Sequence, residues 1–284
     1  MKWSDHRSYA ARVGAQIGMS PCLEKEFLAG SIAPDEERAQ GDRHHPAPVD
    51  TIMAEARAAR VALLAHQHDT AARHLGRLLH YVQDTCILSG DLHDEVERGV
   101  SELNPVLDLA IGDTEPPQGY RSLKAYVASM RAPEPVDDWQ LYLTMVANEA
   151  AARGVVAARS LISRSPPPPR LVGELEECRR RRHAQVKCVS AWGFTAGIVL
   201  ALLKSFLITS IPWWAILLPL LSWPFAAIAT SDCCQDIEYE ALWFGISASG
   251  DERPPLSLDG LSGFLGGPSG SRGRVLFFDS NDKT

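Results

Sequence analysis

Residues 73–84 read Arg-His-Leu-Gly-Arg-Leu-Leu-His-Tyr-Val-Gln-Asp, and they are the most informative part of the chain. Leucines and a valine recur here at helical spacing, which predicts a helix from about Thr70 to Cys86. His80 and Asp84 stand four residues apart, so their side chains project from the same face of that helix. An imidazole and a carboxylate in this arrangement can hold one divalent metal ion together. Because their neighbours are apolar, this polar pair needs partners, which favours a metal site over an exposed ion pair.

His93 and Glu97 repeat the four-residue spacing on the next predicted helix. Helical bundles build metal centres from such pairs on facing helices. The same spacing also occurs in exposed helical pairs, which contribute only roughly 0.2–0.5 kcal/mol. Both interpretations stay open for this pair, and we treat its two side chains as candidate ligands.

More candidate ligands lie upstream, because eight of the nine histidines fall within the first 93 residues. His6 lies in the first predicted helix, whereas Asp35 and the pair His44-His45 lie in a stretch predicted to be a loop. We interpret the other histidines of this region as solvated or capping residues; they are His66, His68 and His74.

The region 1–165 is predicted to be an all-α bundle. Ala, Leu, Arg and Glu dominate it, and no alternating strand pattern is found. Aspartates and threonines stand where they can cap helices, and prolines separate the later helices. The predicted helices run from about Ser4 to Ile17, Thr51 to His66, Thr70 to Cys86, from Asp91 onward, Ser122 to Met130 and Val136 to Ile162.

The composition changes after Pro166–Pro169, which predict a stiff extended spacer. A charged helix, Leu171–Lys187, follows and contains Arg179–Arg182. Two apolar segments come next, Val186–Ile208 and Ile211–Thr230, each about the 20 residues that a bilayer-spanning helix needs. A short turn joins them, which predicts a two-helix transmembrane hairpin. A buried helical hairpin in a soluble core is the alternative.

The positive-inside rule places the arginines, and with them both termini, in the cytoplasm. We therefore predict an integral membrane protein with two spans. Its parts are a helical domain (1–165), a Pro-rich spacer with a basic juxtamembrane helix (166–185), the transmembrane hairpin (186–230) and a cytoplasmic, largely disordered tail (231–284).

Charge and cysteine content restrict the class of protein further. The net charge of −7 and the pI near 5.7 exclude bulk nucleic-acid binding. The polar start of the chain shows no export signal. The six cysteines include no CxxC pair and predict no disulfide framework, so we expect thiols in a reducing compartment.

Four segments in order resemble the zinc-dependent phospholipase C family. They are Trp3-Ser-Asp-His6, Ala29-Gly-Ser-Ile-Ala-Pro-Asp35, His44-His45 and His74-Leu-Gly-Arg-Leu-Leu-His-Tyr-Val-Gln-Asp84, of which the last is the most specific. The match covers roughly residues 1–100. The family is related to the P1-type single-strand nucleases and to the N-terminal domain of glycosylphosphatidylinositol-specific phospholipase D.

The resemblance implies an all-α bundle with one to three zinc ions in a cleft. The implied metal ligands are His6, Asp35, His44, His45, His80, Asp84, His93 and Glu97, with Asp84 able to bridge two ions. Two departures bear on this set. Met1 and Lys2 precede Trp3, whereas the secreted enzymes begin at the tryptophan and use its free amine. Gly90 stands where the family has a histidine, so one ion is expected to lack a ligand.

The function implied is a membrane-anchored, metal-dependent phosphodiesterase, a hydrolase that splits phospholipid headgroup esters with a zinc-activated water. By the same resemblance, Asp35 would be catalytic and would orient or deprotonate that water. The expected partners are a membrane phospholipid as substrate and the lipid bilayer, with no specific nucleic acid. One alternative is a P1-type single-strand nuclease or phosphatase, which the acidic charge and scarce aromatics disfavour. Another is a catalytically degenerate metal-binding membrane protein.

Overall fold

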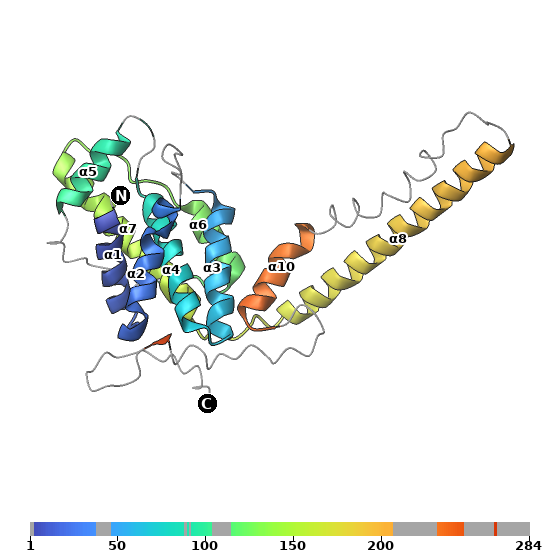
Figure 1. The fold of residues 1–284 in the computed structure, drawn as a ribbon, viewed down its shortest axis with the longest axis horizontal. Coiled ribbons are helices and arrows are strands. Elements are labelled where there is room, and N and C mark those ends of the chain that lie inside the picture. Colours follow the sequence, from blue (N-terminus) through green and yellow to red (C-terminus); the bar gives the residue numbers. More distant parts are fainter. Residues whose placement is uncertain are drawn as a thin grey trace. The chain divides into compact units, whose positions relative to one another are not determined.

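The computed structural model describes residues 3–37, 47–87, 90, 92–103, 115–206, 232–246 and 264–265. These residues form helices and no strand, which confirms the predicted all-α class. The chain divides into two compact units (Figure 1). The first holds the described residues up to Gln118, those of Ser122–Arg164, and Phe264 with Leu265; the second holds Gly119–Arg121 and the described residues from Ser165 to Ile246.

The first unit is a helical bundle built around the helix that the sequence singles out. Its elements are α1 (Trp3–Gln16), a short 3-10 helix (Pro21–Leu23), α2 (Glu24–Glu36), α3 (Val49–Leu64), α4 (His68–Asp84), α5 (His93–Leu103), α6 (Tyr120–Ser129) from Ser122 onward, and α7 (Trp139–Ile162). Helix α4 packs against α1, α2, α3 and α7 (Figure 1). Its apolar face is buried through Leu75, Leu78, Leu79 and Val82. Because four helices surround it, α4 places its polar face inside the bundle.

Helix α2 is the main local difference from the sequence prediction, which placed Asp35 in a loop. The helix includes Pro34 in its last turn. Proline and glycine lower the helical propensity of this stretch, and that is why its sequence does not look helical. Phe27, Ile32 and Ala33 are buried, so tertiary packing stabilises a helix that propensity alone does not favour.

The backbones of α2 and α4 are in contact at two glycines, Gly30 of α2 and Gly76 of α4. A Cβ on Gly76 would overlap the Phe27 carbonyl oxygen and lie 2.7 Å from the Ser31 backbone nitrogen. A Cβ on Gly30 would overlap the Arg73 carbonyl oxygen and lie 3.0 Å from the Arg73 Cα. No side chain fits at either position, so the two helices approach as closely as their main chains allow.

Two residues of the predicted tail belong to the first unit. The Ser20 backbone nitrogen donates a hydrogen bond to the Phe264 carbonyl oxygen at 3.0 Å. Met19 and Leu265 form an isolated antiparallel bridge, and Phe264 is fully buried. This part of the tail is therefore packed against the turn that follows α1.

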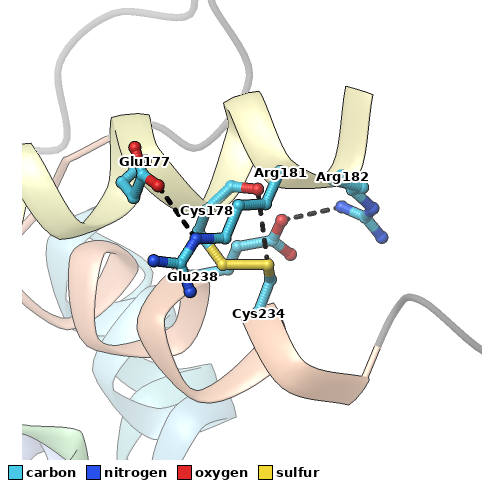
Figure 2. The surroundings of a disulfide bond; sticks show 6 residues. All are labelled: Glu177, Cys178, Arg181, Arg182, Cys234 and Glu238. Atoms are coloured by element: carbon cyan, nitrogen blue, oxygen red, sulfur yellow. Dashed lines mark hydrogen bonds and ion pairs between the residues drawn. A yellow bond between two sulfur atoms is a disulfide. The ribbon is translucent and has the colours of Figure 1, made fainter. Parts of the chain in front are cut away.

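The second unit joins α8 (Leu171–Phe206) to α10 (Asp232–Trp243). A disulfide links Cys178 to Cys234 with 5.8 Å between their Cα atoms, which corrects the expectation that all six cysteines are thiols. Figure 2 shows ion pairs beside it, Arg181 Nε with Glu177 at 2.9 Å and Arg182 with Glu238 at 2.8 Å. Sequence spacing could not show this pairing, because the two cysteines are 56 residues apart and meet only when the helices pack.

The prediction of an integral membrane protein with two spans and cytoplasmic termini is wrong. Within the described ranges, no helix is both long enough and apolar enough to cross a membrane. The described part of the first predicted span is the second half of α8, and the first half of that helix carries Arg179–Arg182. The second predicted span, 211–230, lies outside the described residues. The transmembrane hairpin of the predicted fold therefore has no support.

We predict that Gly76→Ala lowers the free energy of unfolding of the bundle by about 3 kcal/mol or more, because the new methyl group would overlap main-chain atoms that cannot move aside. Urea unfolding followed by circular dichroism measures the loss. The matched control is Gly173→Ala in α8, where a Cβ meets nothing within 4 Å. That control should change stability by less than about 1 kcal/mol. Equal effects of the two substitutions would contradict the close crossing of α2 and α4.

Candidate metal centre

Four of the predicted ligands meet inside the bundle. His6 comes from α1, Asp35 from the last turn of α2, and His80 with Asp84 from α4. His6 and His80 are fully buried, and the side chains of Asp84 and Asp35 are 1% and 13% exposed. Three helices thus converge on one polar point in an apolar interior, and Asp35 lies on its most accessible side.

The distances between the donor atoms suit a small cation. His80 Nε2 lies 3.1 Å from Asp84 Oδ2 and 3.5 Å from Asp35 Oδ1, and His6 Nε2 lies 3.5 Å from Asp84 Oδ1. In tetrahedral zinc sites with bonds of roughly 2.0–2.1 Å, neighbouring ligand atoms lie about 3.3–3.4 Å apart. His6, His80 and Asp84 each offer one ligand atom within 4.8 Å of the others. The residues present therefore fit a zinc ion.

Both imidazoles turn the same nitrogen toward the carboxylates. His80 Nδ1 donates to the Ser31 carbonyl oxygen at 3.0 Å, and His6 Nδ1 is 2.9 Å from the Gln83 side-chain oxygen. A proton held on Nδ1 leaves Nε2 as the atom that faces the centre. Histidines that bind metals are usually oriented in this way by a hydrogen bond from the other ring nitrogen.

The electrostatics of the two histidines differ although their ring centroids are only 4.1 Å apart. Burial lowers the pKa of His6 to about 3, against the opposing effect of the Asp84 carboxylate, so this imidazole is neutral near pH 7. Burial also acts to lower the pKa of His80, but the Asp84 and Asp35 carboxylates outweigh it and raise that pKa. The two carboxylates therefore favour positive charge beside them at His80. His6 keeps the neutral form that binds metals.

His93 and Glu97 lie in a second group. They stand on α5 with Asp94, and the three residues offer ligand atoms within 4.8 Å of one another. This group is distinct from the one formed by α1 and α4. Ser101, also on α5, donates its hydroxyl to the carboxylate of Asp5 on α1. That contact places α5 next to the start of α1.

The remaining predicted ligands, His44 and His45, lie outside the described residues. Gly90, which stands where the resembled family has a histidine, has a φ of 108°. Glycine adopts that conformation freely, whereas a histidine there would be strained. The backbone conformation at this position therefore favours the glycine that the chain has there.

Sequence reasoning missed Gln83, Ser31 and Asp5. Gln83 stands three residues after His80 on the same helix, so helical geometry could have indicated that it lies beside the pair. Ser31 acts through its carbonyl oxygen, which no sequence pattern reveals. Asp5 is 2% exposed and next to His6, but its serine partner is 96 residues away.

Comparisons with protein-family models, with curated proteins and with solved structures find no match to this chain. The phospholipase C resemblance therefore stays a prediction.

A separate polar network lies earlier on α4. Arg77 Nε donates to Glu55 at 2.8 Å and Arg77 also pairs with Glu37 at 2.6 Å, while His74 Nδ1 lies 2.7 Å from Glu55. Burial acts to raise the pKa of Glu55, but its hydrogen bonds with His74 and Arg77 outweigh this effect and lower it. This network joins the end of α2 to α3 and α4, and it gives the partly exposed His74 a structural contact.

We predict a pH-dependent stability difference between wild type and Glu55→Gln. Because folding lowers the pKa of Glu55, its contribution is fully present above its usual pKa of 4.5 and is lost as the pH falls below that value. Wild type should be the more stable by about 1–2 kcal/mol at pH 7. Urea unfolding between pH 7 and pH 3 measures how this difference shrinks.

Glu26→Gln is the control for that experiment. Glu26 and Arg73 lie 3.9 Å apart with side chains 32% and 56% exposed. Exposed pairs of this kind contribute roughly 0–1 kcal/mol, so little change is expected at any pH. A Glu55→Gln difference that grew on acidification would refute the assignment.

Proposed function

We propose that this chain is a metal-dependent phosphodiesterase that resembles zinc-dependent phospholipase C and hydrolyses phospholipid headgroup esters. One observation carries the proposal: His6 and His80 turn Nε2 toward the two oxygens of the buried Asp84 carboxylate, at 3.5 and 3.1 Å. Such a set of nitrogen and oxygen donors is typical of zinc. The same residues occupy the ligand positions that the sequence resemblance implies, which supports this class of hydrolase.

The positions of the residues support a role for each in the proposed reaction. Asp84 presents one oxygen to each histidine, so it can hold a shared cation or bridge two. A bound zinc ion would supply Lewis-acid activation of a water and neutralise charge on the phosphoryl oxygens. Asp35 is the most exposed of the four side chains, and its carboxylate lies 3.5 Å from His80 Nε2. Its position supports the proposal that Asp35 would orient that water and accept its proton.

A second candidate function is metal binding without hydrolysis. His6, His80 and Asp84 are all buried, and zinc sites that are closed by protein ligands are usually structural. Gly90 removes one ligand that the family uses, which points in the same direction. In this case the ion would stabilise the crossing of α1, α2 and α4 rather than catalyse a reaction.

Metal analysis tests the centre. Full-length wild type, purified without chelator, should contain at least one zinc ion per chain. Asp84→Asn should bind zinc about 100-fold or more weakly, because losing even a hydrogen-bond partner of a zinc ligand lowers zinc affinity roughly 10–100-fold. Asp69→Asn is the matched control, since this exposed aspartate lies on the same helix. Equal zinc content in wild type and Asp84→Asn would end the proposal of a metal centre.

Activity assays then separate the candidate functions. A zinc-loaded wild type that releases phosphorylated headgroup from a short-chain phosphatidylcholine, with Asp35→Asn inactive, supports the phosphodiesterase. Cleavage of single-stranded DNA instead would favour the nuclease alternative. Zinc binding with no turnover of either substrate would favour the structural metal site.

A further inference from the structure

Gln83 is a buried polar residue that contacts the proposed centre without being one of its ligands. Its side chain is inaccessible to solvent, and its Oε1 lies 2.9 Å from His6 Nδ1. It stands on α4 between His80 and Asp84, the two proposed metal ligands from that helix. The contact therefore joins α4 to α1 at the point where their ligands meet.

The orientation of the amide fixes the proton of His6. An amide oxygen only accepts, so the proton of the neutral imidazole lies on Nδ1 and the lone pair lies on Nε2. Nε2 is 3.5 Å from Asp84 Oδ1, and a neutral imidazole binds a cation through this lone pair. If the amide were turned, its NH2 group would donate to Nδ1, and the proton on Nε2 would block the ligand atom.

Stability alone does not account for this glutamine. The amide nitrogen of Gln83 is buried and has no hydrogen-bond partner among the residues that the structure describes. Burying an amide with one of its two groups unpaired costs free energy, and an apolar side chain on this helix would avoid that cost. Among the described residues, Gln83 contacts His6 through its amide oxygen, and an apolar residue could not supply that contact.

We propose that Gln83 is a positioning residue: it holds His6 in the tautomer whose Nε2 can bind the cation. The proposal rests on the metal centre of the proposed function and adds a residue that acts through a ligand. His80 is held in the same way by the Ser31 carbonyl oxygen, at 3.0 Å. The two imidazoles are thus oriented by different hydrogen-bond acceptors. His80 donates to a main-chain oxygen from α2, and His6 donates to a side-chain oxygen from α4.

The test uses the full-length chain with Gln83→Leu, which removes the acceptor, and Gln83→Glu, which keeps one. Zinc affinity should fall roughly 10–100-fold in Gln83→Leu, the usual cost of losing such a partner. It should stay within about threefold of wild type in Gln83→Glu, because a carboxylate accepts the same proton. Circular dichroism checks that both variants are folded.

A tautomer measurement separates positioning from a merely structural role. Long-range proton–nitrogen NMR of the metal-free protein, with His6→Gln used to assign the signal, should show His6 with its proton on Nδ1 in wild type and in Gln83→Glu. The Nε2–H form should increase in Gln83→Leu. A wild-type His6 protonated on Nε2 would overturn the proposal even if the leucine variant did not fold.

The outcomes for the two proposals differ. If wild type binds zinc and Gln83→Leu binds it equally well, the metal centre stands and the role of Gln83 is wrong. If wild type binds no zinc at all, the proposed function fails and the role of Gln83 fails with it. Loss of affinity in the leucine variant together with rescue by glutamate supports both.

Discussion

The structure of the bundle depends on the contact between the main chains of α2 and α4. Gly30 and Gly76 let the two helices approach so closely that a Cβ at either position would overlap the backbone of the other helix. This approach brings the Ser31 carbonyl oxygen within 3.0 Å of His80 Nδ1 and Asp35 within 3.5 Å of His80 Nε2. A wider crossing would separate the histidine from both groups. The packing of two glycines is therefore also what gives His80 its orientation.

The polar centre that results is costly to bury and has a chemical use. Two carboxylates and two imidazoles lie in an interior lined by apolar helices, where unpaired charge is strongly disfavoured. Asp84 relieves part of this cost by presenting one oxygen to each histidine. A divalent cation would relieve more, because it balances the carboxylates and uses the neutral Nε2 atoms.

The second unit is held by other means. Helices α8 and α10 are joined by the Cys178–Cys234 disulfide and by the ion pair between Arg182 and Glu238. The arginines that the sequence suggested as a topology signal are in part paired with glutamates, Arg181 with Glu177 and Arg182 with Glu238. A run of basic residues therefore indicates a charged helix, and its contacts decide whether that charge is available to a membrane.

The sequence by itself determined the all-α class, the approximate limits of most helices, and the pairing of His80 with Asp84, because these depend on spacing along a single helix. The tertiary structure alone decided that Asp35 lies in a helix rather than a loop, that Gln83 and Ser31 orient the histidines, and that two cysteines form a disulfide. Among the residues that the structure describes, it also shows no helix long and apolar enough to cross a membrane, so the transmembrane hairpin has no support. The physical reason is common to all of these: contacts between distant segments depend on how helices pack, and local patterns do not encode packing.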